Sequence, residues 1–393
     1  MATGTATRQT AAPASTAEVA QVLREAYAQD RAVMPRGNAT KLDWGVPPRR
    51  TDVVLDLRGV SGVVEHAAGD LVVVVRAGTP VAELQDVLAT TGQQLALDSP
   101  LPGTVGGLVA TAVSGPRRLL YGTVRDLLIG VTFVRADGVV AKAGGRVVKN
   151  VAGYDFGKLL SGSFGTLGVV TEAVFRLHPV PAARLVVSVR TADPATAGRL
   201  ALAVVGSQLV PSAVELHLAE DPVGGVTVTC LFEGVATGVG ERAQQAQRIL
   251  GPTATVTEDL PDGFADLPYR GNDSGIGLKV TSSLSGVGPT LETTQRLAEQ
   301  QGLALSGGGS AAGVLHFRLP ADSEPGAVKS FVESLRGHQR RYDGGVVVLT
   351  APPEVRGDVD MWGPVAGLEL MRRLKQELDP KHLLSPGRFV GGI

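Results

Sequence analysis

The sequence predicts an α+β protein that folds as two or three compact units. Its 393 residues are 44% hydrophobic and 19% charged, which is enough apolar material for a substantial core. Short runs rich in β-branched residues alternate with amphipathic helical patterns along most of the chain. Two prolines in the segment His178-Pro179-Val180-Pro181 stiffen the chain and remove backbone donors, so we expect a domain boundary there.

The first unit begins with helix signals and continues with strands. Ser15 and Glu18 have the spacing of a capping box, which predicts a helix ending near Asp30, and residues 1–15 are expected to form a disordered tail. A second helix is predicted to begin at Pro80, whose fixed φ suits a first helical position. β-branched runs predict strands at Ala32–Met34, Val53–Leu57, Val63–Val64 and Leu71–Arg76.

A hairpin and a long strand complete the first unit. Asp137-Gly138 lies within Leu127–Ala143 and supports the positive φ values of tight turns, so two strands are expected around it. The strand Gly168–Leu177 leads to the two prolines. Beyond them, two rounds of strand, helix and strand predict a two-layer α/β or α+β unit, and a last helix is expected at about Val365–Leu378. The predicted division is 1–15, 16–181, 182–362 and 363–393.

Composition limits the possible functions. Net charge is −1, from 37 basic and 38 acidic side chains, so nothing in the charge balance indicates a nucleic acid or an anionic membrane as a partner. Cys230 is the only cysteine, whereas an iron–sulfur cluster needs about four thiolates; any such electron relay must lie in another chain. The most hydrophobic run, Leu71–Val75, is far shorter than the ~20 residues of a membrane-spanning helix, and a cytoplasmic chain is expected.

Three glycine-rich clusters are the strongest candidates for a binding site. Glycine allows backbone N–H groups to converge closely on a diphosphate, and Thr40, Thr104, Arg36 and Lys41 could add hydroxyl donors or positive charge. The clusters match neither the dinucleotide fingerprint G-x-G-x-x-G nor the phosphate loop GxxxxGK[ST], which disfavours nicotinamide and ATP sites of the usual kind. One such cluster could be only a tight turn, but three favour a nucleotide cofactor. They are Pro35–Lys41, Leu101–Gly107 and Gly162–Gly168.

Six motifs follow one another in a recognisable order: PRGNATK, PGTVGG, YGTVRD (Tyr121–Asp126), ADG, KNVAGYD (Lys149–Asp155) and GSFGTLGVVTEAVFRLHP. This order resembles the FAD-binding domain of the vanillyl-alcohol oxidase and p-cresol methylhydroxylase (PCMH) type. Within that family it closely resembles the FAD-binding subunits of bacterial glycolate oxidases. The resemblance is continuous over about Ala32–Pro181 and returns in Asp379–Phe389.

The resemblance implies a two-subdomain PCMH-type FAD-binding domain, then an α/β cap domain, with the C-terminal helix and tail returning to the flavin domain. The diphosphate would lie against the first two clusters. Some relatives attach FAD covalently through histidine or cysteine in these loops, but the loops here contain neither, so noncovalent FAD is expected. The expected cofactor-binding residues are Pro35, Arg36, Gly37, Asn38, Ala39, Thr40, Lys41, Leu101, Pro102, Gly103, Thr104, Val105, Gly106, Gly107, Gly122, Thr123, Gly168, Val169 and Val170.

Oxidation of a 2-hydroxy acid requires a cation for the carboxylate and a base for the hydroxyl proton. Relatives that oxidise D-2-hydroxy acids carry a histidine-rich metal-binding stretch in the cap, and the corresponding region here, Ser306–His316, keeps only His316. No metal site is expected, because the six histidines show no ligand spacing. The candidates for catalytic groups are Arg117 (with its neighbour Arg118), Lys149, His316 and Arg388, each of which could instead be a structural residue or a surface charge.

The resemblance implies one subunit of a glycolate oxidase complex. Its partners would be a metal-bearing flavin subunit and an iron–sulfur subunit, and its substrate a small 2-hydroxy acid. Electrons from the oxidation of glycolate to glyoxylate would reach membrane quinones through those partners, so membrane contact would be indirect. Two alternatives stay open: a self-sufficient flavin dehydrogenase for another alcohol or hydroxy acid, and a noncatalytic scaffold subunit.

Overall fold

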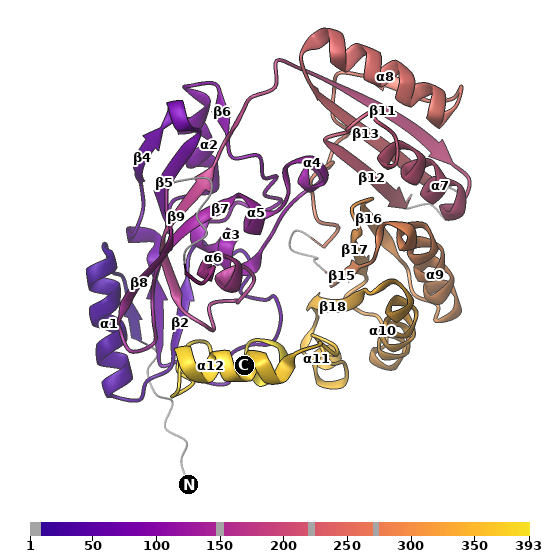
Figure 1. Cartoon of the computed structure of the whole chain (residues 1–393). Coiled ribbons are helices and arrows are strands. Elements are labelled where there is room, and N and C mark those ends of the chain that lie inside the picture. The colour runs from indigo at the N-terminus through magenta and orange to yellow at the C-terminus, as the bar shows by residue number, and fades with distance from the viewer. Residues whose placement is uncertain (1–8, 147–152, 219–224, 270–274) are drawn as a thin grey trace. The chain divides into compact units, whose positions relative to one another are not determined.

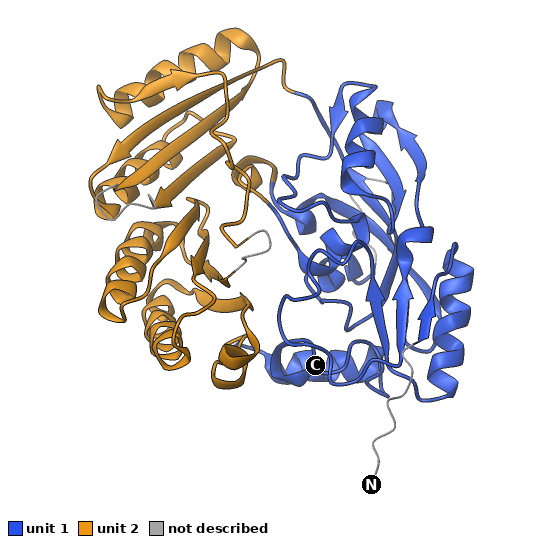
Figure 2. Ribbon diagram, turned by 180° about the vertical axis from the view of Figure 1, so that it is seen from behind, with its two compact units in different colours: residues 1–114, 122–180, 365–393 blue, residues 115–121, 181–364 orange. Residues whose placement is uncertain are grey.

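The structure is a computed structural model that describes residues 9–146, 153–218, 225–269 and 275–393. The chain divides into two compact units, each built from segments that are not contiguous in sequence (Figure 2). Unit 1 consists of residues 1–114, 122–180 and 365–393, and unit 2 of residues 115–121 and 181–364. The chain therefore leaves unit 1 for unit 2 and returns to unit 1 with its last helix and tail.

Unit 1 contains two main sheets. The larger is antiparallel with the strand order β4-β5-β9-β7-β8, and the smaller is parallel with the order β1-β3-β2. The hairpin expected around Asp137-Gly138 is confirmed, because β7 pairs with β8 and Gly138 has a φ of +79°. The strands are β1 Gln9–Ala11, β2 Val33–Arg36, β3 Val53–Asp56, β4 Val63–Ala67, β5 Val72–Arg76, β6 Gln93–Gln94, β7 Leu128–Val134, β8 Val140–Gly144, β9 Val169–Arg176 and β10 His178–Pro179.

The helices of unit 1 begin where the sequence supplies caps. The expected start of the first helix is confirmed: the Ser15 hydroxyl accepts a hydrogen bond from the Glu18 N–H at 3.2 Å. Thr104 caps a helix that the sequence did not predict, which starts inside the second glycine cluster. The helices are α1 Thr16–Ala28, α2 Val81–Ala89, α3 Val105–Thr111, α5 Val124–Leu127, α6 Phe156–Leu160 and α12 Leu368–Leu378.

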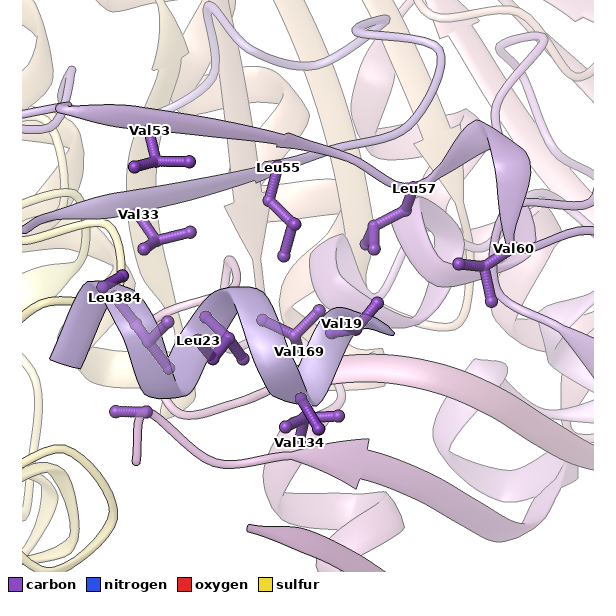
Figure 3. Packing of buried hydrophobic residues seen from close by; sticks show 13 residues of the cluster. Val19, Leu23, Val33, Val53, Leu55, Leu57, Val60, Val134, Val169 and Leu384 are labelled. Atoms are coloured by element: carbon purple, nitrogen blue, oxygen red, sulfur yellow. The ribbon is translucent and has the colours of Figure 1, made fainter. Parts of the chain in front are cut away.

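The core beneath α1 joins distant parts of the chain. Val19 and Leu23 of α1 pack against Val33 of β2 and Leu55 of β3, together with Leu384 of the C-terminal tail (Figure 3). Each of these five side chains is essentially inaccessible to solvent. The hydrophobic core of unit 1 is therefore incomplete without the C-terminal tail.

The prediction of a disordered tail up to residue 15 is wrong for residues 9–11. These residues form β1, which pairs in parallel with β3 and places Thr10 opposite Val54. The open edge of β3 offers backbone donors and acceptors that any chain can satisfy. Pairing of this kind leaves no hydrophobic pattern in the sequence, so propensity alone misses it.

Unit 2 is built on one long antiparallel sheet with the strand order β14-β11-β13-β12-β16-β17-β15-β18. Helices α7 to α10 lie against one face of it (Figure 1), where apolar residues such as Val187, Val214 and Phe232 are fully buried. The strands are β11 Ala183–Thr191, β12 Ala213–Leu218, β13 Val226–Gly234, β14 Thr255–Thr257, β15 Ile276–Thr281, β16 Ser306–Ser310, β17 Val314–Leu319 and β18 Gly345–Thr350. The helices are α4 Arg118–Tyr121, α7 Pro194–Val205, α8 Ala236–Leu250, α9 Val287–Gln300, α10 Pro325–Gln339 and α11 Pro353–Asp358.

Among the described strands of unit 2, only β16 was not predicted by the sequence pattern, because its sequence is Ser-Gly-Gly-Gly-Ser. Glycine normally weakens a strand, but here it permits a close backbone approach. A Cβ atom at Gly308 would overlap the carbonyl oxygen of Leu216 on the neighbouring strand. None of the described helices is both long enough and apolar enough to span a membrane.

We expect Leu384→Ala to lower the free energy of unfolding of unit 1 by about 2–5 kcal/mol, because it opens a cavity in a core that cannot collapse fully. Chemical denaturation followed by circular dichroism measures this change. Leu370→Ala, at a position that is 57% exposed on α12, is the matched control and should change stability by less than about 0.5 kcal/mol. Equal, small effects of both substitutions would contradict the tail's place in the core.

Candidate functional site

An open cavity lies within unit 1. It is lined by parts of all three glycine clusters together with Arg388 from the tail. The expected cofactor residues that line it are Pro35, Arg36, Gly37, Asn38, Ala39, Thr40, Lys41, Thr104, Gly106, Gly107, Gly168, Val169 and Val170. The structure adds lining residues that were not among the expected cofactor residues: Leu42, Leu57, Ala77, Ala110 and Thr111, together with Ser163, Phe164 and Gly165 of the third glycine cluster.

The other expected cofactor residues are not part of this lining: Leu101, Pro102, Gly103, Val105, Gly122 and Thr123. Two of these residues lie next to residues that form the lining. The Pro102 carbonyl accepts a hydrogen bond from the Asn38 side chain at 3.1 Å, and Val105 is fully buried. Thr123 instead forms a capping box with Asp126 at the start of α5.

The first two glycine loops touch each other, and glycine is what allows it. A Cβ atom at Gly37 would overlap the Thr104 hydroxyl, and one at Gly103 would lie 2.9 Å from Nζ of Lys41. The Thr104 hydroxyl in turn accepts the Gly107 N–H at 3.3 Å. The loops therefore form a backbone-rich wall with small polar groups, which suits a diphosphate better than a bulky apolar ligand.

Two cations line the cavity in the first loop, and they differ in how their charge is balanced. Arg36 makes a 2.7 Å ion pair with Asp56, which also binds Arg58; hydrogen bonds from Arg58 and Arg36 lower the pKa of Asp56. Lys41 is 6% exposed and forms its hydrogen bond with Thr40 at 3.2 Å. It has no carboxylate partner among the described residues, and burial lowers its pKa to about 8. An anionic ligand would supply the missing countercharge.

The other candidate of this unit, Arg388, lines the cavity, but its guanidinium also binds the protein. Its Nη2 donates to the carbonyl oxygens of Lys41 at 3.0 Å and Leu42 at 3.3 Å. Burial lowers the pKa of Arg388. Lys149 lies outside the described residues.

In unit 2, polar side chains gather on the sheet face opposite the helices. The strand registers place His217, Gly308, His316 and Lys279 in one row across β12, β16, β17 and β15. Residues directly opposite each other in neighbouring strands share a face. Because Gly308 contributes no side chain, nothing separates His217 from His316 within that row.

Lys279 is a residue that the sequence analysis missed. It lies between buried Leu278 and Val280 in β15 and is paired with no carboxylate among the described residues. Burial, with a smaller effect from Arg118, lowers its pKa to about 8. A single lysine in an otherwise apolar strand was the signal that could have revealed it.

His316 contacts Tyr269 and lies beside positive charge. Its Nδ1 is 2.7 Å from the Tyr269 hydroxyl. Burial lowers the pKa of His316 well below 6.5, and the charges of Lys279 and Arg118 lower it further, so the imidazole is neutral at pH 7. The Tyr269 contact would suit a structural histidine, whereas the neighbouring positive charges of Lys279 and Arg118 favour an anion near this position.

Arg117, the last sequence candidate, binds a protein carboxylate. It forms an ion pair with Glu233 of β13 at 3.5 Å, and the Tyr121 hydroxyl lies 3.4 Å from the same carboxylate. Burial raises the pKa of Tyr121, and the charge of Glu233 adds to this effect. These contacts attach residues 115–121 to the sheet of unit 2. Across the described ranges, no three His, Cys, Asp or Glu side chains are grouped so that they could hold a metal ion.

Comparison with known proteins identifies the class. Residues 7–144 match the FAD binding domain family, and residues 360–389 match the C-terminal domain of FAD linked oxidases. A solved structure of alkyldihydroxyacetonephosphate synthase superposes with a TM-score of 0.71 at 19% identity, covering 97% of this chain and 77% of that one. That likeness shows the fold alone.

The chain is thus an FAD-dependent oxidoreductase with an FAD-binding domain of the PCMH type, and the expected α+β fold class and FAD cofactor are confirmed. Over 94% of its length it is 29% identical to the glycolate oxidase subunit GlcE of Escherichia coli (strain K12), of which it covers 96%. It is also 28% identical to the D-lactate dehydrogenase of Archaeoglobus fulgidus, over 96% of this chain and 90% of that protein. The resemblance to bacterial glycolate oxidase subunits is confirmed.

FAD fits the donor set of the unit 1 cavity. The diphosphate would take the place of the carboxylate that Lys41 lacks, against the backbone of the loops at Gly37 and Gly106, while Thr104 could donate its hydroxyl. Among the described residues, no histidine or cysteine lines the cavity, so the described lining offers neither of the side chains expected for a covalent link to the cofactor.

We expect Lys41→Met to weaken FAD binding by about tenfold to 100-fold, the loss typical of one hydrogen bond to a charged group. Fluorescence titration of the apoprotein with FAD measures it. In the wild type the affinity should fall as pH rises through about 8, because only the protonated Lys41 attracts the diphosphate. The variant should lose this pH dependence.

The matched control is Lys142→Met, which removes a lysine from the exposed strand β8. The stability of the apoprotein provides a second readout. Because the folded pKa of Lys41 lies below its unfolded value of 10.5, wild-type stability should rise with pH between about 8 and 10.5, and Lys41→Met should remove that rise. An affinity for FAD that is unchanged in Lys41→Met would exclude the diphosphate from this loop.

Proposed function

We propose that this chain is the FAD-binding subunit of a 2-hydroxy acid oxidase or dehydrogenase assembly of the glycolate oxidase type. The observation that carries the proposal is similarity over nearly the full length of both chains to a glycolate oxidase subunit, and a D-lactate dehydrogenase of similar coverage points to the same class of substrate. Glycolate and lactate are both small 2-hydroxy acids. The expected products are the corresponding 2-oxo acids.

The polar face of unit 2 has groups that suit such a substrate. Lys279 is protonated at pH 7, since its pKa is about 8, and it lacks a carboxylate partner among the residues described. A substrate carboxylate would supply that partner. Arg118 lowers the pKa of both Lys279 and His316, which indicates that the neutral His316 ring lies in a positive region formed by Lys279 and Arg118.

His316 is the group that we propose as the base. Its low pKa keeps the imidazole neutral at pH 7. If Nδ1 keeps its proton and donates it to the Tyr269 oxygen at 2.7 Å, Nε2 can accept the proton of the substrate hydroxyl. Tyr269 would then fix the tautomer and the orientation of the ring.

FAD, bound noncovalently, would supply the acceptor for the hydride that leaves the α-carbon of the hydroxy acid. Further electron transfer requires another chain. Cys230 is the only cysteine; it is buried and burial raises its pKa to about 12, whereas an iron–sulfur cluster needs about four thiolates. We propose an iron–sulfur subunit and a metal-bearing flavin subunit as partners in a cytoplasmic assembly that contacts the membrane only through them.

The direct test is anaerobic mixing of the FAD-loaded chain with glycolate or D-lactate while the visible flavin absorption is followed. Bleaching of the flavin by the chain alone supports oxidation at this subunit. Bleaching only in the presence of partner subunits supports relay of electrons. The proposal is wrong if the flavin is bleached in neither case and if FAD can be removed from this chain without loss of the activity of the assembly. That result would favour the noncatalytic scaffold subunit.

We expect the apparent second-order rate constant of flavin reduction by the hydroxy acid to fall as pH rises through about 8, because deprotonated Lys279 no longer binds a carboxylate. Lys279→Met should lower that constant by about tenfold to 100-fold and remove the decline above pH 8. Stopped-flow reduction at several pH values measures both effects.

Lys329→Met, an exposed lysine on α10, is the matched control for Lys279→Met. His316→Gln should slow the limiting rate of reduction much more than it changes substrate affinity, as expected for a base. Retention of the wild-type limiting rate in His316→Gln would remove the histidine from the chemistry while leaving the role of Lys279 open to its own test.

A further inference from the structure

An ion pair that solvent does not reach links helix α12 to the tail that follows it, residues 379–393. Nζ of Lys375 lies 2.6 Å from Oδ2 of Asp379, and both side chains are 0% exposed. Nζ also donates to the carbonyl oxygens of Thr166 at 2.7 Å and Leu384 at 3.1 Å. The ammonium group thus uses all three of its donors on oxygen atoms of the protein.

Asp379 is equally occupied. Its Oδ1 accepts the N–H of Leu383 at 3.0 Å, and its Oδ2 accepts the N–H of Leu384 at 2.7 Å in addition to the ammonium of Lys375. One ion pair therefore fixes the backbone of the tail at Leu383 and Leu384. It also fixes a distant segment through Thr166.

That distant segment is the third glycine loop. Thr166 lies between Gly165 and Gly168, which both line the cavity of unit 1. Phe164 of the same loop lines the cavity and stacks on Phe389 of the tail, with ring centroids 5.7 Å apart. Helix α12 thus contacts the third loop through the hydrogen bond from Lys375, and the tail contacts it through the aromatic stack with Phe389.

The tail also holds the first glycine loop. The Val33 N–H donates to Leu383 at 2.8 Å, and the Ser385 N–H donates back to Val33 at 2.9 Å. Val33 begins β2, which continues directly into the loop that carries Lys41. Farther along, Arg388 binds the Lys41 carbonyl at 3.0 Å. The two loops on which the cavity depends are therefore held by one short stretch of chain.

Stability alone is a weak reason for such a pair, because replacing a buried ion pair by apolar residues of similar volume is often neutral or stabilising. An apolar pair, however, could not bind the carbonyl of Thr166 or the N–H groups of Leu383 and Leu384. What the charged pair adds is a fixed geometry between the tail and the loop.

We propose that Lys375 and Asp379 are positioning residues for the cofactor, which set the distance between the first and third glycine loops without touching FAD themselves. Neither residue lines the cavity. The inference rests on the assignment of this cavity to FAD and goes beyond the proposed oxidation of hydroxy acids, because it concerns retention of the cofactor whatever the substrate is.

The test is the double variant Lys375→Met with Asp379→Leu in the full-length chain. It removes both charges together, so that no unpaired charge stays buried. The backbone groups left unpaired should lower the midpoint of thermal unfolding of the apoprotein. At a temperature well below that midpoint, we expect the dissociation constant for FAD, measured by fluorescence titration, to rise at least tenfold. Retention of the wild-type dissociation constant would overturn the proposal.

A second pair of variants keeps the test decisive if the double variant does not fold. Asp379→Asn preserves the size of the side chain and one acceptor, and should raise the FAD dissociation constant at a temperature well below its unfolding midpoint. Thr290→Val, which disrupts the buried hydrogen bond with Gln339 in unit 2, serves as the control of comparable destabilisation. If Thr290→Val weakens FAD binding as much as Asp379→Asn does, the pair acts through stability alone and the proposal is wrong.

The failure of this inference can be distinguished from failure of the cavity assignment. If Lys41→Met weakens FAD binding and the double variant does not, FAD occupies the cavity but the tail does not set its geometry. If neither change affects binding, the assignment of the cavity itself is wrong.

Discussion

The free-energy cost of burying the ammonium group of a lysine is the constraint on which the rest of the structure depends. An ammonium group that leaves water without a partner is expensive, so buried lysines are normally paired. Lys375 follows this rule, with Asp379 and two carbonyl oxygens around it. Lys41 and Lys279 do not, since each has a pKa lowered to about 8 by burial and no carboxylate partner among the described residues. Lys375 therefore holds parts of the protein together, whereas Lys41 and Lys279 are available to anionic ligands.

This division explains why the cavity of unit 1 is assembled from separate stretches of chain. The loops must present backbone and a charged side chain to a ligand, so they cannot be filled with the apolar side chains that would otherwise hold them together. Close contacts at Gly37 and Gly103 bring the first two loops together, and the tail holds the first and third. The loops are thus held in place by contacts around the cavity, because apolar packing inside the cavity cannot hold them.

The parts of the site that the sequence predicts are those with local chemistry. The glycine loops were recognisable because the requirement for glycine and small hydroxyl residues is confined to a few neighbouring positions. Lys279 was not recognised, since its meaning depends on its register with His316 across the β15–β17 pair. Arg117 looked like a free cation near a loop, whereas the fold gives it Glu233, which lies more than one hundred residues further along the chain.

The same limit applies to the secondary structure. Helix caps and the Asp-Gly turn are encoded within four or five residues, so α1 and the β7–β8 hairpin were predicted correctly. Strands β1 and β16 lack any apolar alternation, and they form because a neighbouring strand offers an unpaired edge or because glycine allows close approach. These two strands depend on their neighbours in the folded sheet, so a local sequence pattern cannot predict them.

The path of the chain has a further consequence for unit 1. Its N-terminal part, up to residue 180, is separated from its last segment by most of unit 2. Until that segment arrives, β2 lacks the hydrogen bonds to Leu383 and Ser385, the core under α1 lacks Leu384, and the third loop lacks its contact with Lys375. Such long-range contacts form late, because closing a long loop costs entropy before any contact offsets it. The first and third glycine loops therefore have their full set of contacts only when residues 365–393 are packed against the rest of unit 1.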